Sequence, residues 1–262
     1  MYALAPRGAA GLDRGALAEH VEHLVSPAPV ALAVSSWMEP WALSSQERRA
    51  CIETVTSLAG RRCPVVVDVT CDAIGDAVAL AEIAIGAGAD LCYLAAPHEW
   101  SSSVALAEDW IELVAGRIQA PTVVGWVTTA GDRLDAERLA GLPGVTGVVP
   151  ALEMTGPRTW DGHPVPDIVS QLLESPAWRP FSDPGVAGEE EAAALSVLCA
   201  AITPPPGRPA RWGSDVAVVK WLSSWRGSAV GDPLPPAPAL EPAQERTLAA
   251  RVSALSGPLG LT

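Results

Sequence analysis

Short apolar runs alternate with amphipathic stretches along this chain. Runs such as 64–70 and 91–96 are apolar at nearly every position, which is the pattern of strands buried on both faces of a parallel sheet. Amphipathic stretches separate these runs and are expected to form helices. The pattern predicts eight strands, near residues 2–5, 30–35, 64–70, 91–96, 122–128, 145–149, 178–182 and 197–202.

Two of the predicted helices carry end signals in the sequence. The helix at 43–58 opens with Ser44, Ser45 and Glu47, which suit an N-cap and an acidic first turn. The helix at 76–88 ends at a glycine, which suits a C-cap. Strands recur about every 30 residues, as in βαβ units. Repeated units of this kind favour a (β/α)8 barrel or a doubly wound sheet.

The strand–helix alternation weakens after residue 156. A proline- and glycine-rich stretch at 203–213 precedes a helix predicted at 215–226. A second such stretch, at 231–238, separates this helix from another predicted at 241–255. We therefore expect a barrel over residues 1–203, followed by a linker and C-terminal helices over 204–262. The core is expected to contain apolar strand residues, namely Leu32, Val34, Val65, Val67, Leu94, Val123 and Val148.

Composition narrows the class of protein. Of the 262 residues 49% are apolar and the net charge is −13, so a nucleic-acid partner or an anionic membrane surface is not expected. The sequence has no apolar run long enough to span a membrane and no basic segment followed by an apolar one at its start. Five scattered cysteines without a CxxC pair are typical of reduced thiols. We expect a cytoplasmic protein.

Three stretches together resemble the dihydrodipicolinate synthase / N-acetylneuraminate lyase family of class I aldolases. They are 31-ALAVSSWMEPWALSSQER-48, 64-PVVVDVTCDAIGDAVALAEIAIGAGADLCYLAAP-97 and 215-DVAVVKWLSSWRG-227. The resemblance implies a (β/α)8 barrel with a C-terminal helical extension. It is weak over 156–213, where the end of the barrel and the start of the extension are shortened, so the extension is expected to be truncated.

The resemblance also implies a Schiff-base lysine, which this chain lacks at the matching place. That position falls on Val149 or, one residue on, Pro150. The single lysine, Lys220, matches a lysine of the C-terminal helix, for which a surface or salt-bridge role is expected. Arginine cannot substitute, because it stays protonated and forms no imine. Class I aldol chemistry is therefore expected to be absent.

Other family groups are also replaced. The tyrosine that relays a proton falls on Gly125, and the threonines that hold a keto-acid carboxylate fall on Ser36 and Trp37. A tyrosine pair after the fourth strand becomes His98 and Glu99. The family's glutamate is kept as Glu39.

The carboxyl ends of the predicted strands nevertheless carry polar and aromatic residues, where a barrel builds its site. Asp68 lies inside an apolar strand and is either a general base with a raised pKa or an aspartate that caps a backbone amide. His98 and Glu99 are either an acid–base pair or a solvated loop pair. The expected ligand-binding residues are Ser36, Trp37, Glu39, Thr70, Trp100, Trp126 and Thr128. No metal-ligand spacing is present, and neither a metal nor a cofactor is expected.

Two functions remain open. The first is a pseudoenzyme or small-molecule-binding protein derived from the family. The second is a lyase or hydratase that uses Asp68, His98 and Glu99 for acid–base chemistry on a small aromatic or keto-acid substrate.

Trp221 and Trp225 lie four residues apart, on one face of a predicted helix. With the C-terminal helices shortened, we expect a dimer with a second copy or a paralogue.

Overall fold

The computed structural model divides into two compact units. It describes residues 3–8, 11–26, 31–34, 39, 42–60, 62–126, 133–149, 159–160, 163–164, 215–225, 227–228, 230–235 and 237–256. One unit, here the sheet unit, contains residues 30–156, and the other, the terminal unit, contains residues 3–29 and 157–262. The predicted boundary at residue 203 lies outside the described residues.

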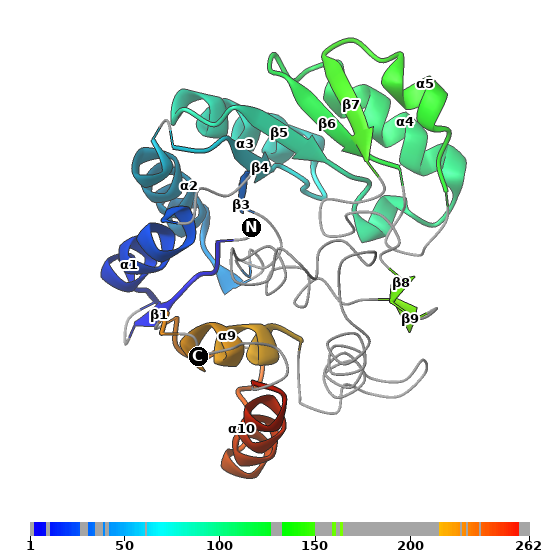
Figure 1. Cartoon of the computed structure of the whole chain (residues 1–262). Helices are drawn as coiled ribbons and strands as arrows, with labels where there is room; N and C mark the ends of the chain where they lie inside the picture. The colour runs from blue at the N-terminus through cyan, green and yellow to red at the C-terminus, as the bar shows by residue number, and fades with distance from the viewer. Residues whose placement is uncertain are drawn as a thin grey trace. The chain divides into compact units, whose positions relative to one another are not determined.

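The sheet unit contains five parallel strands that pair in chain order (Figure 1). They are β3 (Leu32–Val34), β4 (Val65–Asp68), β5 (Leu91–Leu94), β6 (Thr122–Gly125) and β7 (Val145–Val149). Each predicted strand in this range is confirmed. The strands predicted at 178–182 and 197–202 lie outside the described residues.

Helices separate the strands, as the alternation predicts. They are α2 (Ser45–Ala59), α3 (Ile74–Gly86), the 3₁₀ helix η3 (His98–Trp100), α4 (Val104–Ala115) and α5 (Ala136–Ala140). Ser44 and Glu47 cap the start of α2 reciprocally, each side chain accepting the other's backbone N–H. Helix α3 begins and ends two residues before its predicted bounds, and the glycine expected to end it, Gly88, follows with φ +98°.

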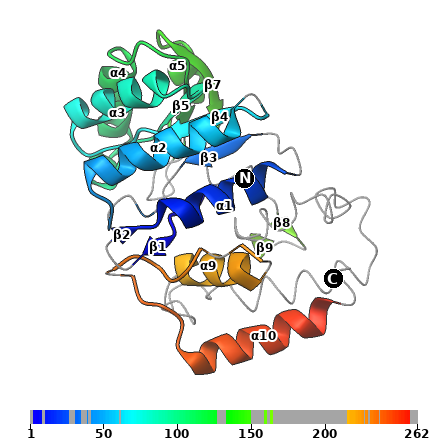
Figure 2. The same cartoon turned by 90° about the vertical axis from the view of Figure 1, so that its left-hand side faces the viewer.

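The two faces of this sheet differ in their surroundings. Helices α2 to α5 cover one face (Figures 1 and 2), and Val65, Val67, Cys92 and Leu94 are at most 1% exposed. Because side chains alternate along a strand, the opposite face carries Asp68, Tyr93, Val123, Gly125 and Val149, which the strand register places in neighbouring positions. We call these five residues the inner face.

The predicted core is confirmed at five of its seven positions. Leu32, Val34, Val65, Val67 and Leu94 are buried. Val123 and Val148 are only half-buried. In β6 the fully buried residue is instead Val124, which pairs with Leu94 on the helix-covered side. Val148 pairs with Val124 but lies on β7, the last strand of the described sheet, and is therefore less covered.

The terminal unit is mainly helical. It contains α1 (Arg14–Val25), α9 (Asp215–Trp225) and α10 (Pro242–Ser256), and the last two confirm the predicted C-terminal helices. Two short antiparallel pairs complete its described part, β1 (Arg7–Gly8) with β2 (Gly11–Leu12) and β8 (Thr159–Trp160) with β9 (His163–Pro164). The predicted strand at 2–5 is not formed in its described part, although residues 3–5 are fully buried.

Lys220 is buried in the terminal unit, so the predicted surface role is wrong. Its side chain is 0% exposed. The Nζ donates to the carbonyl oxygens of Ala5 (2.6 Å) and Asp232 (3.0 Å). The lysine thus satisfies a carbonyl of the N-terminal segment, Ala5, that would otherwise need a strand partner. It joins that segment to α9 and to the segment after it.

His20 is a second buried polar group of this unit. It is 2% exposed, and its Nδ1 lies 2.6 Å from the Ser228 hydroxyl oxygen. Loss of water around the ring lowers its pKa to about 3, with smaller contributions from the charges of His23 and Lys220. The folded protein therefore holds this histidine neutral.

We predict that the protein loses folding stability in acid, because His20 must stay neutral in the folded state. The unfolded chain takes up this proton near pH 6.5 and the folded chain only near pH 3, so folding stability falls as pH decreases between these values. The slope from this residue is about 1.4 kcal/mol per pH unit. Urea unfolding across this range should show a smaller slope for His20→Gln. The exposed neighbour variant His23→Gln should keep most of the slope. Equal slopes for all three proteins would contradict the assignment.

Candidate functional site

Asp68 is the last residue of β4 and organises the end of the strand. Its Oδ1 accepts the backbone N–H of Thr70 at 2.9 Å. The Thr70 hydroxyl oxygen in turn accepts the backbone N–H of Ala95 at 3.0 Å, which joins the ends of β4 and β5. Asp68 therefore caps a backbone amide, one of the two roles that the sequence left open. This contact also fixes the direction of its carboxyl group.

Burial raises the pKa of the Asp68 carboxyl above its usual value. The hydrogen bonds from Thr70 and the charge of Arg48 act in the opposite direction but do not cancel the loss of water. Arg48, in the first turn of α2, donates from Nη1 to the Cys71 Sγ at 3.6 Å. Asp68 therefore binds a proton more readily than an exposed aspartate, as a general acid or base requires.

The other two predicted acid–base residues lie on η3, which follows β5. His98 begins this helix and Glu99 is exposed on it. The neighbouring Trp100 is 38% exposed and donates from Nε1 to the Asp72 carbonyl oxygen at 3.0 Å. This hydrogen bond ties Trp100 to the segment after β4, which also contains Thr70.

Glu39 combines full burial with an unusual backbone. It is 0% exposed and has φ +54°, the only non-glycine residue with positive φ in the described part of the chain. Such conformations cost free energy and concentrate at functional sites. Three further predicted ligand-binding residues lie outside the described residues, namely Ser36, Trp37 and Thr128.

Trp126 follows β6 and lies beside the position matched to the family's lysine. Its backbone N–H donates to the Val149 carbonyl oxygen at 2.9 Å, and its carbonyl oxygen accepts from the Leu134 N–H at 2.8 Å. The Arg133 guanidinium lies 5.4 Å from the centre of its indole ring, within cation–π range. The structure thus holds a half-buried aromatic ring at the carboxyl ends of β6 and β7.

Tyr93 is a candidate residue that our reading of the sequence missed. A methyl group built on Gly125 would lie 2.3 Å from the Tyr93 hydroxyl oxygen and 3.1 Å from its Cζ. The phenol of β5 therefore occupies the space that a side chain at position 125 would take. Tyr93 is only 4% exposed. Strand alternation places it on the same face as Asp68, and this was the available signal.

The strand register brings the five residues of the inner face together. Tyr93 pairs with Asp68 on one side and Val123 on the other, and Gly125 pairs with Val149. The Tyr93 hydroxyl therefore lies next to the position matched to the missing lysine, at a point where the resemblance implies a tyrosine on another strand. The inner face thus combines a carboxyl group, a phenol and an apolar wall.

The described residues contain no group of three or more His, Cys, Asp or Glu side chains that could hold a metal ion. A helix long and apolar enough to cross a bilayer is likewise not found in the described part.

Similar solved structures define the fold as a (β/α)8 barrel with a helical C-terminal part. Dihydrodipicolinate synthase from Agrobacterium tumefaciens is 21% identical, with a TM-score of 0.73 over 97% of this chain and 96% of that chain. The synthase from Oceanobacillus iheyensis is 17% identical, with a TM-score of 0.70 over 98% and 95%. N-acetylneuraminate lyase from Fusobacterium nucleatum is 14% identical, with a TM-score of 0.73 over 97% and 98%.

The family follows from the sequence match. The model of the dihydrodipicolinate synthetase family matches residues 6–155, more than half of the chain. The chain belongs to this family, which confirms the resemblance. No curated protein matches the chain. The predicted shortening of 156–213 falls almost wholly outside the described residues.

We predict an energetic coupling between Tyr93 and Gly125. Gly125→Ala should lower the free energy of unfolding by about 1–3 kcal/mol, because the new methyl group meets the phenol. In the Tyr93→Phe background the nearest contact becomes the ring carbon at 3.1 Å, so the loss should be smaller by at least about 0.5 kcal/mol. A double-mutant cycle from urea unfolding measures this difference.

Gly147→Ala on the neighbouring strand is the matched control. A methyl group there would meet only the Val123 Cγ2, at 3.9 Å, and should cost little. Equal costs at positions 125 and 147, or strict additivity with Tyr93→Phe, would show that the phenol does not fill this space.

Proposed function

We propose that this protein is a small-molecule-binding member of its family that does not perform class I aldol chemistry. The observation that carries the proposal is the lack of a suitable amine. The only lysine, Lys220, is fully buried in the terminal unit, and its Nζ donates hydrogen bonds to two carbonyl oxygens. Position 149 is a valine, and an imine cannot form without a primary amine.

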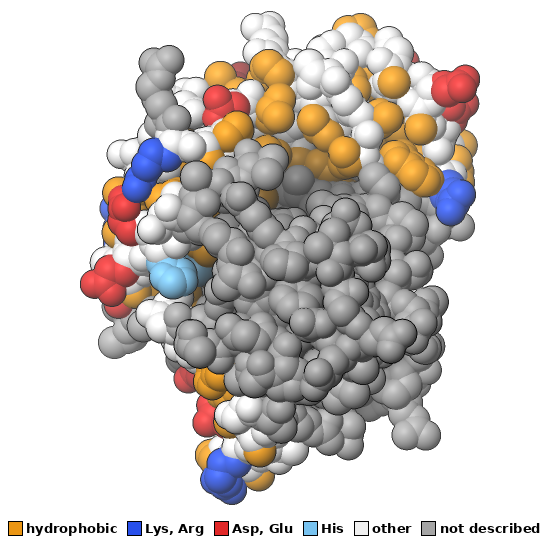
Figure 3. Space-filling model, viewed as in Figure 1, with side chains coloured by type: hydrophobic (Ala, Val, Ile, Leu, Met, Phe, Trp, Pro, Cys, Tyr) orange, Lys and Arg blue, Asp and Glu red, His pale blue; other side chains and the backbone are white. Residues whose placement is uncertain are grey.

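The ligand site is proposed on the inner face and at the strand ends beside it. Hydrophobic side chains gather over β5 to β7 in the space-filling view (Figure 3). On β6 and β7, Val123, Val145 and Val149 are half-buried. The Tyr93 phenol and the Asp68 carboxyl group give this apolar wall two polar groups. An apolar surface with a few polar groups is the composition typical of small-molecule sites. The ligand-binding residues proposed from the sequence stay part of this proposal, namely Ser36, Trp37, Glu39, Thr70, Trp100, Trp126 and Thr128.

A second candidate function is a lyase or hydratase that works without a Schiff base. The observation that favours it is Asp68, a half-buried carboxyl group with a raised pKa, fixed by Thr70 on the same face as a phenol. In this alternative Asp68 acts with His98 and Glu99 as the acid–base groups. The substrate is a small aromatic or keto-acid molecule.

We further propose a dimer in the cytoplasm, formed with a second copy or a paralogue. Support for assembly comes from α9, where Trp225 is 37% exposed and Trp221 is half-buried one turn earlier. Large exposed aromatic side chains are enriched at protein interfaces. Support for the compartment comes from the four described cysteines, Cys51, Cys63, Cys71 and Cys92, which are all free thiols.

We predict that pyruvate and borohydride leave the mass of the protein unchanged. Reductive trapping requires an amine in the pocket, and Val149 offers none. Intact-protein mass spectrometry measures the result. An adduct that peptide mapping assigns to a barrel residue, rather than to the N-terminal amine, would falsify the proposal.

The variant Val149→Lys is the positive control for this experiment. It places an amine on the inner face and should give a trapped adduct. It should not restore aldol cleavage, because the Tyr93 phenol comes from a different strand than the family's relay tyrosine and Trp37 replaces a carboxylate-binding threonine.

Light scattering at micromolar concentration tests the assembly proposal, with a dimer mass as the expected outcome. Trp225→Ser should shift the mass toward the monomer, because the substitution removes exposed apolar area. Trp100→Ser, at a residue of similar exposure on the sheet unit, is the matched control and should not. A monomeric wild-type protein would contradict the dimer and would favour the acid–base function at Asp68 instead.

A further inference from the structure

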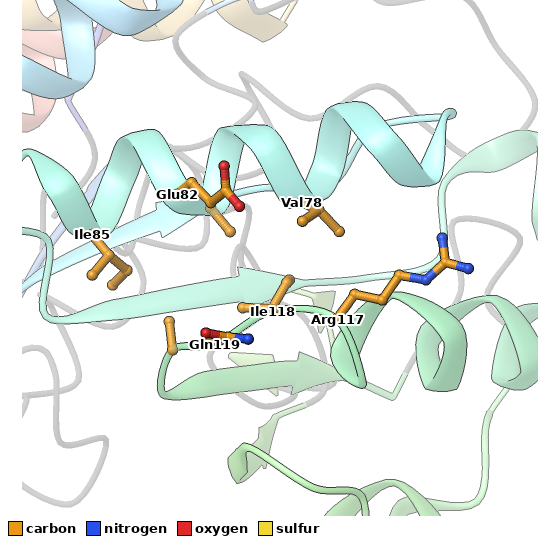
Figure 4. Close-up of a pocket in the computed structure, with 8 residues that line it drawn as sticks. Val78, Glu82, Ile85, Arg117, Ile118 and Gln119 are labelled. Carbon is orange, nitrogen blue, oxygen red and sulfur yellow. The ribbon is translucent and has the colours of Figure 1, made fainter.

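A pocket lies in the sheet unit at the amino ends of the strands. Helix α3 forms one wall and the turn between α4 and β6 forms the other (Figure 4). Its volume is about 290 Å³, the lower end of the range for small-molecule sites. Because barrel active sites lie at the carboxyl ends of the strands, this pocket is separate from the candidate site above. The lining residues that matter here are Val78, Glu82, Ile85, Arg117 and Ile118.

The lining combines an apolar floor with two opposite charges. Val78 and Ile85 from α3 face Ile118 from the opposite wall (Figure 4). Glu82 extends from the first wall and Arg117 from the second, and both are exposed. Within the described part of the chain, neither charged side chain makes an ion pair or a side-chain hydrogen bond. Both therefore remain available to a ligand.

These charges restrict the chemistry of the ligand. Glu82 disfavours a phosphate or any multiply charged anion, and Arg117 disfavours a simple cation. A molecule with one carboxylate and one ammonium group satisfies both, since a guanidinium binds a carboxylate through paired hydrogen bonds. The aliphatic floor suits an aliphatic side chain, and the volume suits a single amino acid. We propose that this pocket binds a free aliphatic amino acid, with its carboxylate at Arg117 and its ammonium at Glu82.

Isothermal titration calorimetry with three probes tests this proposal. The probes are L-leucine, 4-methylpentanoate (the same chain without the ammonium) and 3-methylbutylamine (the same chain without the carboxylate). Leucine should bind at least about tenfold more tightly than either analogue, because each charge-assisted contact contributes at least that factor. A leucine dissociation constant weaker than about 1 mM would overturn the proposal. Equal affinities for all three probes would also overturn it.

Substitutions assign each charge to its partner. Arg117→Gln should reduce leucine affinity about tenfold and leave the amine probe unaffected. Glu82→Gln should reduce leucine affinity similarly and leave the carboxylate probe unaffected. Arg49→Gln, an exposed arginine paired with Glu53 on α2, is the matched control and should bind leucine normally. An equal loss in all three variants, or none in any, would show that leucine does not bind here. Neither result bears on the aldol trapping experiment, which concerns the inner face.

Discussion

The register of the parallel strands is the constraint on which the candidate site depends. Backbone hydrogen bonds align β4 to β7 so that Asp68 lies beside Tyr93, and Gly125 lies beside Val149. A shift of one residue in any of these strands would turn its inner residues toward the helices. The buried residues on the other face, such as Cys92 and Leu94, prevent that shift because their apolar area would then be exposed. Packing against the helices therefore holds the inner face in place.

Within that register, the position of the Tyr93 side chain depends on the lack of a side chain at Gly125. The Tyr93 phenol reaches across to β6 only because position 125 is a glycine. A family position that carries a tyrosine can thus lose its side chain without leaving an empty space, since the neighbouring strand supplies a phenol instead. A phenol therefore lies beside position 125, while position 149 is a valine. This arrangement supports the proposed ligand site without imine chemistry.

Lys220 shows how a buried charged side chain can link distant segments of a fold. A buried ammonium is costly unless its hydrogen bonds are satisfied, and here two carbonyl oxygens accept from it. One of them, Ala5, belongs to a segment far away in sequence. The compact ammonium can point its rotatable N–H groups at two backbone oxygens from different segments, whereas a guanidinium holds its donors in a rigid planar fork. The lysine for which a surface role was expected therefore holds two segments of the terminal unit together.

The sequence by itself determined the strand–helix alternation, the capping of α2, the C-terminal helices and the family. These features depend on hydrophobic period and local hydrogen bonding, which neighbouring residues control. It also identified Asp68 as unusual, because a carboxyl group inside an apolar strand is visible as a pattern. Only the tertiary structure decided the role of Lys220, the half-burial of Val123 and Val148, and the approach of Tyr93 to Gly125. Each of these depends on contacts between residues distant in sequence, and strand register and packing set those contacts rather than local composition.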